Sequence, residues 1–244
     1  MALHDESADD LQKLVYGISH DLGAPMRTVV QFSNLLVQSL ADRLTEKEQY
    51  WLQLIRDGGI QGQQMIEALK VYSRLVTQPH EASVFSLQQL TDETIIKIQK
   101  LFPQQKNDIE ITSRLPDIFA SREYWRVILS ELIKNAVLFQ PKDDEHQVHV
   151  VIAYQLTDGD IAVSVEDNGL GVAEQQWSAI TVPFKRLQRK DEYPGLGMGL
   201  CYCDRIAQLL NGRLTFGHSG LGGLAVTFAH SFVEHPQSSV RGKS

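Results

Sequence analysis

The sequence has few cysteines and no hydrophobic run long enough to cross a membrane. Its 244 residues contain two cysteines, Cys201 and Cys203, in an apolar stretch. Their spacing fits neither a disulfide framework nor a four-ligand zinc site, so a reducing cytoplasm is expected. No apolar run approaches the roughly 18–20 residues of a membrane span, and the acidic, polar start is not a signal peptide. We therefore expect a soluble cytoplasmic chain that makes no membrane contact itself, with room for a sensor or membrane segment upstream.

Positive charge is also scarce. The chain has 23 Lys and Arg against 30 Asp and Glu, which gives a formal net charge of −7. Affinity for nucleic acid depends on clustered Lys and Arg, so we expect no nucleic-acid partner. Hydrophobic residues make up 43% of the chain, which is enough for the core of one large or two modest domains.

Two long helical patterns occupy the N-terminal part. Apolar residues recur at three- and four-residue steps from Asp9 to Leu40, which predicts one amphipathic helix kinked near Pro25. A second pattern runs from about Glu46 to Val76 and begins with a capping box of Thr45 and Glu48. The resulting antiparallel hairpin has a wide apolar stripe. A dimeric four-helix bundle would cover that stripe, which predicts a homodimer. Packing of the stripe on the rest of the same chain is the alternative.

A mixed pattern of strands and helices follows a boundary near Pro79. Strands are expected at 84–86, 109–112, 118–120, 147–156, 160–166, 212–218 and 224–232, and helices at 87–102, 121–139 and 201–210. Helices on one face of a largely antiparallel sheet predict an α/β sandwich of the α+β kind. We accordingly expect domains at 1–78 and 79–235 and a disordered tail at 236–244.

A histidine followed at once by a carboxylate lies inside the first helical pattern. Ser19–Pro25 reads Ser-His-Asp-Leu-Gly-Ala-Pro, and the proline would loosen the helix about where His20 lies. Asp21 could take the imidazole Nδ1–H, which would fix the tautomer and make Nε2 a better nucleophile. A solvated histidine without a catalytic role would explain the same residues.

Two stretches of the second domain suit a nucleotide. Glu131 and Asn135 lie one turn apart on a helix face, and an amide oxygen is a fair ligand for Mg²⁺. Asp167 ends a strand and could accept a hydrogen bond from a purine amine, while Gly169 and Gly171 let the backbone turn sharply. Each stretch also has a purely structural explanation. Asn135 could cap the helix or bridge two groups, and the glycines could form an ordinary turn.

A glycine-rich stretch leads straight into the last predicted helix. Gly195–Leu200 reads Gly-Leu-Gly-Met-Gly-Leu, so backbone N–H groups at a helix N-terminus could bind phosphate. It is not the Walker pattern, and it does not follow the first strand of a βαβ unit. The segment before it carries four cations that look like triphosphate contacts, with a solvated loop as the alternative: Lys185, Arg186, Arg189 and Lys190.

In this order, the stretches resemble the motifs of the sensor histidine kinases. Ser19–Pro25 resembles the phosphoacceptor box of the family's dimerisation and histidine-phosphotransfer domain. The family's catalytic ATP-binding domain has four motifs, which are called the N, G1, F and G2 boxes. The stretches of this chain that resemble them are, in that order, Asn135, Asp167–Gly171, Pro183–Phe184 and Gly195–Leu200. That domain has the Bergerat fold, which gyrase-type and Hsp90-type ATPases share. The likeness covers about residues 9–233.

The resemblance implies an ATP-dependent protein histidine kinase of a two-component system. His20 would be the phosphoacceptor and would pass the phosphoryl group to an aspartate of a response-regulator receiver domain. The second domain would bind ATP and Mg²⁺, with Asn135 and, through water, Glu131 on the metal and Asp167 on adenine. Further nucleotide contacts would come from the other motif residues: Gly169, Gly171, Phe184, Lys185, Arg186, Gly195, Gly197, Gly199 and Leu200.

Three positions depart from the family pattern. Leu138 stands where a basic residue often follows the N-box asparagine, so Lys185 or Arg189 would have to compensate at the phosphates. Gly23 stands where the family often has Arg or Lys after His-Glu-Leu. Ala24 replaces the Thr or Asn of phosphatase-competent members, which predicts weak phosphatase activity.

Two other functions stay open on the residues alone. A non-catalytic dimeric phosphotransfer or scaffold protein with a decayed ATP site is favoured by Leu138. A gyrase-type or Hsp90-type ATPase would use a carboxylate at the position of Glu131 to activate water. Such an ATPase needs no phosphoacceptor, so the His20-Asp21 pair argues against it.

Overall fold

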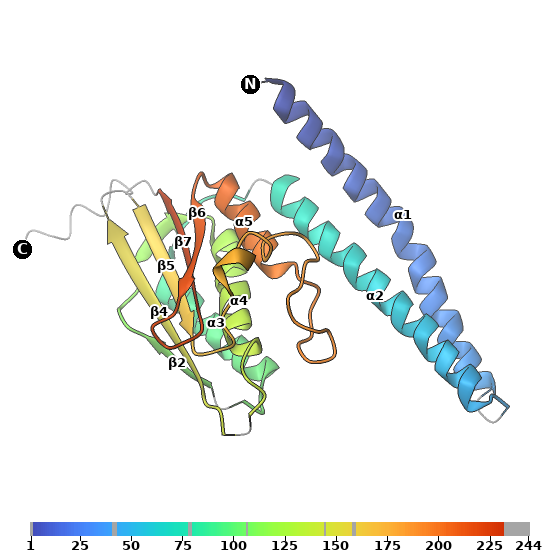
Figure 1. The fold of residues 1–244 in the computed structure, drawn as a ribbon. Coiled ribbons are helices and arrows are strands. Elements are labelled where there is room, and N and C mark those ends of the chain that lie inside the picture. The colour runs from blue at the N-terminus through green and yellow to red at the C-terminus, as the bar shows by residue number, and fades with distance from the viewer. Residues whose placement is uncertain are drawn as a thin grey trace, which may run out of the picture. The chain divides into compact units, whose positions relative to one another are not determined.

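A computed structural model describes residues 2–40, 43–77, 80–105, 107–143, 145–157 and 160–231 (Figure 1). By its contacts the chain divides into two compact units, Met1–Gln78 and Pro79–Ser244. The predicted tail at 236–244 and the centre of the turn expected at 157–159 lie outside the described residues. No helix in the described part of the chain is both long and apolar enough to span a bilayer.

The first unit is a hairpin of two helices, α1 (Ala2–Leu40) and α2 (Glu46–Thr77) (Figure 1). α1 begins earlier than predicted and runs on through Pro25 as one helix; a kink there stays a prediction. The backbone N–H of Thr45 donates to the Glu48 carboxylate at 2.8 Å, and the Glu48 N–H donates to the Thr45 hydroxyl at 3.3 Å. These two reciprocal bonds confirm the predicted capping box at the start of α2.

Glycines of α2 bring the two helices close together. A β-carbon on Gly59 would stand 2.7 Å from Val30 Cγ2, and one on Gly62 would stand 2.9 Å from Met26 Sδ. Both distances are shorter than a carbon contact allows, so any larger residue would push the helices apart. The cost of glycine in the middle of a helix is therefore offset here by close packing.

The second unit contains two sheets. β1 (Ser83–Ser86) pairs antiparallel with β3 (Asp117–Ala120). The larger sheet has the order β2-β4-β5-β7-β6, and its strands are β2 (Asn107–Ile111), β4 (Val148–Thr157), β5 (Asp160–Asp167), β6 (Arg213–His218) and β7 (Leu224–Ser231). β2 runs parallel to β4, and the other described pairs of this sheet are antiparallel. The sheet is therefore largely antiparallel, as predicted.

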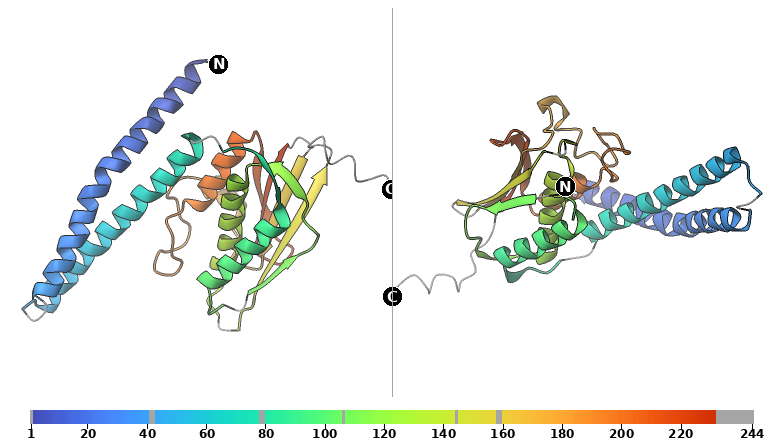
Figure 2. Two further views of the ribbon diagram at one scale, coloured as in Figure 1. Left: turned by 180° about the vertical axis from the view of Figure 1, so that it is seen from behind. Right: turned by 90° about the horizontal axis from the view of Figure 1, so that it is seen from below.

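One face of the larger sheet is covered by α3 (Leu87–Leu101), α4 (Arg122–Leu138) and α5 (Gly199–Leu209) (Figures 1 and 2). Alternate residues of β5 are buried beneath these helices, including Ile161, Val163 and Val165. α4 contributes Trp125 and Ile128 to the same core, and both are fully buried. The unit is the predicted α/β sandwich, with α4 as its central helix.

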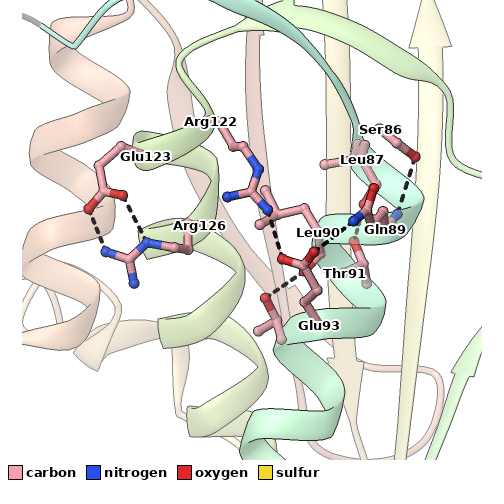
Figure 3. Close-up of polar contacts among 10 residues, drawn as sticks. Ser86, Leu87, Gln89, Leu90, Thr91, Glu93, Arg122, Glu123 and Arg126 are labelled. Atoms are coloured by element: carbon pink, nitrogen blue, oxygen red, sulfur yellow. Dashed lines mark hydrogen bonds and ion pairs between the residues drawn. The ribbon is translucent and has the colours of Figure 1, made fainter.

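Polar contacts fix the N-terminal ends of α3 and α4 (Figure 3). The Ser86 hydroxyl caps α3 by accepting the backbone N–H of Gln89 at 3.2 Å. Arg122 in the first turn of α4 pairs with Glu93 of α3 at 2.7 Å. This ion pair joins α3 to the first turn of α4, the helix that carries the candidate site.

Candidate functional site

The start of α5 packs against a polar face of α4. Glu131 and Asn135 lie one turn apart on α4, and Gly199 is the first residue of α5. A β-carbon on Gly199 would collide with Oε2 of Glu131 and stand 3.6 Å from Nδ2 of Asn135. Glycine permits this approach because it has no β-carbon. The glycine-rich stretch therefore ends beside the two residues predicted to serve a metal ion.

Lys134 belongs to the same face, although the sequence did not single it out. Its ammonium forms an ion pair with the Glu131 carboxylate, and their side chains are 35% and 17% exposed. Both charges lie close enough to Cys203 on α5 to act on its thiol. Burial raises the pKa of this thiol well above its usual value, Glu131 raises it further, and Lys134 opposes the shift. The three-residue spacing of Glu131 and Lys134 was the sequence signal for this pair.

Asp167 lies at the end of β5 and is 8% exposed. Its Oδ1 accepts the backbone N–H of Gly169 at 2.8 Å and that of Leu224 at 3.2 Å. Burial raises the pKa of this carboxyl, and the two backbone donors oppose the rise. Within the described residues no donor is bonded to Oδ2. One oxygen thus organises the turn, and the other is available to a ligand.

The turn after Asp167 is held against the end of α4. The Leu170 N–H donates to the Phe139 carbonyl at 3.0 Å. A β-carbon on Gly169 would stand 2.5 Å from that carbonyl oxygen, and Gly171 has a φ of 63°, in the left-handed region. The predicted requirement for glycines in this turn therefore has two different causes, a close approach and a backbone conformation.

The segment between Phe184 and Gly195, which we call the lid, is anchored at both ends. The Arg186 guanidinium donates to the backbone carbonyls of Tyr193 and Gly195. Gly197 follows with a φ of 75°, and a β-carbon on it would stand 2.5 Å from the Lys185 carbonyl oxygen. The lid thus folds back on its own start, directly before the glycine-rich stretch enters α5.

The predicted cations of the lid differ in what they contact. Arg186 is engaged with lid carbonyls, and Lys185 is exposed. Arg189 pairs with Asp191 at 3.0 Å and lies 3.9 Å from Glu192. If Arg189 supplied the phosphate contact that a basic residue at position 138 would make, its guanidinium would have to leave the carboxylates of Asp191 and Glu192. Lys185 is exposed and is paired with no carboxylate among the described residues, so its charge is free for that role.

His20 and Asp21 lie in the other unit, on α1. Asp21 is exposed, whereas the side chain of His20 is outside the described residues. The structure therefore brings the nucleotide candidates together on α4 and keeps the phosphoacceptor candidate on a separate compact unit.

A magnesium ion is compatible with the residues on α4. No group of three or more His, Cys, Asp or Glu side chains in the described ranges could hold a metal ion alone. Magnesium bound with a nucleotide keeps several waters and shares phosphate oxygens, so it needs one or two protein ligands. The amide of Asn135 and the neighbouring Glu131 carboxylate fit that requirement.

Comparisons with known proteins show the family of this chain. Residues 121–234 match the family of histidine kinase-, DNA gyrase B- and HSP90-like ATPases. Phytochrome-like protein Cph1 of Synechocystis sp. is 26% identical over 210 residues, which are 86% of this chain and 28% of that protein. Sensor histidine kinase YvrG of Bacillus subtilis is 30% identical over 211 residues, which are 83% of this chain and 35% of that protein.

A solved structure shows the same fold. The crystal structure of full-length ShkA in complex with AMPPNP has a TM-score of 0.66 and 22% identity, and the match covers 92% of this chain and 47% of that one. The chain belongs to the histidine kinase family, and its second unit is the ATPase domain of that family. It spans 28% and 35% of the two curated relatives named above.

Proposed function

We propose that this chain is the kinase core of a two-component system, which phosphorylates His20 with ATP and passes the phosphoryl group to a response-regulator aspartate. The observation that carries the proposal is the convergence on α4 of two separate parts of the second unit. Gly199 at the start of α5 lies against Glu131 and next to Asn135. The turn after Asp167 is bonded to the end of the same helix.

ATP would bind along this face of α4. Oδ2 of Asp167 would accept the exocyclic N–H of adenine, because Oδ1 is occupied by two backbone donors. Backbone N–H groups at the start of α5 would bind the phosphates. Asn135 would hold magnesium directly and Glu131 through water. The bound ion would offset charge on the phosphate oxygens.

The transfer would be an in-line displacement at the γ-phosphorus. The lone pair of His20 Nε2 forms the new N–P bond, the bond from phosphorus to the bridging oxygen breaks, and ADP leaves with that electron pair. Asp21 would hold the Nδ1 proton and balance the positive charge that develops on the imidazole. Attack of a receiver aspartate on phosphohistidine would then regenerate His20.

The helical hairpin would pair with a second copy of the chain. Phe32 on α1 and Trp51 on α2 are 60% and 50% exposed, although both are large and apolar. Further exposed apolar residues extend the stripe along both helices: Leu22, Val29, Leu35, Leu36, Leu54 and Ile55. A four-helix bundle would bury this surface. Trp51→Glu should shift the chain toward monomer in analytical ultracentrifugation, and a monomeric wild type would refute the pairing.

Incubation with γ-labelled ATP tests the function. Wild type should gain acid-labile label, and His20→Ala should lose it while binding ATP normally, because His20 lies outside the ATPase unit. His218→Ala, which removes an exposed histidine of the second unit, is the control and should be labelled like wild type. Released phosphate without labelled protein would indicate a gyrase-type or Hsp90-type ATPase. Absence of both label and ATP binding would indicate a scaffold.

A further inference from the structure

Two cations from different helices converge beside Gly23, one turn after His20. Gly23 is buried on α1, and a β-carbon on it would stand 3.4 Å from Nη1 of Arg27 and 3.9 Å from Nζ of Lys70, which belongs to α2. Glu67 lies 3.6 Å from the Lys70 ammonium, but its side chain is 61% exposed. Two positive groups beside the same residue repel each other, and an anion between them would remove that cost.

The helix register sets Lys70 level with the phosphoacceptor. The contact of Gly62 with Met26 aligns α2 with α1, and α2 runs opposite to α1 in the hairpin (Figure 1). From the contact of Gly62 with Met26, α2 continues toward its C-terminus while α1 is followed back toward its N-terminus. Along this path Lys70 on α2 comes level with the turn of α1 that carries His20. The Lys70 side chain then extends toward Gly23, where its ammonium and the Arg27 guanidinium both lie within 4 Å of the missing β-carbon.

Helical spacing also places the cations on the side of His20. Residues three, four and seven positions apart share a helix face, so Gly23 and Arg27 both lie on the face of α1 that carries His20. The tips of Arg27 and Lys70 supply the contacts within 4 Å of the missing β-carbon. The space that a side chain at position 23 would occupy is therefore bordered by positive charge.

We propose that Lys70 and Arg27 bind the oxygens of the phosphoryl group on His20, so that α2 supplies the cation that position 23 lacks. This inference rests on the proposed role of His20 as phosphoacceptor. The two cations offset charge on the phosphoryl oxygens during transfer and in phosphohistidine. In the structure Glu67 lies 3.6 Å from the Lys70 ammonium. A basic side chain at position 23 would meet both cations.

Single-turnover labelling from bound γ-labelled ATP tests this role. Lys70→Gln should slow labelling about fivefold and leave ATP affinity unchanged, because one partly exposed charge contact is lost in the first unit. Lys70→Arg, which keeps the charge, should be labelled within about twofold of the wild-type rate. Lys47→Gln removes the same charge from the first turn of α2 and should match wild type.

A second-site change separates charge from packing. Gly23→Lys in the Lys70→Gln chain should restore the labelling rate to within about twofold of wild type, because it returns a cation to the same space and suits a helix better than glycine. High salt should narrow the difference between wild type and Lys70→Gln, since exposed charges are screened.

Three results would overturn the inference. The first is an unchanged rate in Lys70→Gln when wild type is labelled normally. The second is a slow Lys70→Gln chain that neither Gly23→Lys nor Lys70→Arg restores, because Lys70 would then act through packing. The third is a wild type without acid-labile label, which would refute the proposed function of His20 and this inference with it.

Discussion

The hydroxyl of Tyr193 donates a hydrogen bond to the backbone carbonyl of Gln140 at 2.9 Å. This bond connects the lid with the residues that follow α4. The Tyr193 ring also lies 5.7 Å from the ring of Phe139, and the Lys142 ammonium lies 5.2 Å from its centre. The sequence did not single out Tyr193, yet it is 6% exposed and anchors the C-terminal end of the lid to the segment that follows α4.

Tyr193→Phe should destabilise the second unit by about 1 kcal/mol, because the buried Gln140 carbonyl loses its donor. Urea unfolding measures this change as a lower midpoint. Trypsin should also cleave faster after Arg189 or Lys190, since the lid opens more often. Tyr50→Phe is the control, because Tyr50 is 61% exposed on α2. Equal midpoints for Tyr193→Phe and wild type would show that the bond does not hold the lid.

Gly199→Ala should weaken ATP binding about tenfold, or about 1.4 kcal/mol. The added methyl group would collide with the Glu131 carboxylate. The start of α5 would then move away from Asn135, and its backbone N–H groups would lose their position at the phosphates. Gly217→Ala is the matched control, since nothing lies within 4 Å of its missing β-carbon. Titration calorimetry with ATP distinguishes the two variants, and equal affinities would remove Gly199 from the site.

Asp167→Asn should weaken ATP binding by roughly 1.5–3 kcal/mol. The asparagine oxygen can still accept the N–H groups of Gly169 and Leu224, so the turn should keep its structure. Nδ2 then replaces Oδ2, which places a donor opposite the adenine amine. Calorimetry should show the loss with ATP, while the thermal unfolding midpoint stays near that of wild type. Unchanged ATP affinity would defeat the assignment of Asp167 to adenine.

The pKa of Asp167 adds a pH dependence to the same experiment. In the proposed complex the adenine amine donates a hydrogen bond to this carboxylate, so binding favours the ionised form. Burial raises the pKa of Asp167 above its usual value near 3.8. On acidification the ATP affinity of wild type should therefore begin to fall at a higher pH than for an exposed aspartate. Asp167→Asn should lack this component of the pH profile.

Patterns formed by residues that are close together in the sequence predicted the fold well. The capping box of Thr45 and Glu48 and the alternation of buried residues along β5 needed only neighbouring residues. The contacts of Tyr193 and Lys70 were missed because their partners, Gln140 and Gly23, lie far away in the sequence. The start of α1 was placed too late because the polar first residues lack the apolar spacing by which a helix is recognised.

The last prediction concerns dephosphorylation of the response regulator. A phosphatase must hold a water in line with the phosphorus, and Ala24, one turn after His20 and exposed on α1, has no group that could do so. The nearby Thr28 hydroxyl donates to the Ala24 carbonyl at 3.1 Å, so it is already engaged. We therefore expect little phosphatase activity from wild type and a gain from Ala24→Thr. The measurement is the decay of purified phospho-regulator without nucleotide, with Ala24→Ser as a second hydroxyl variant and Ala24→Val as the control of similar shape. Rapid decay with wild type, or equal decay with the Thr and Val variants, would show that position 24 does not orient the water.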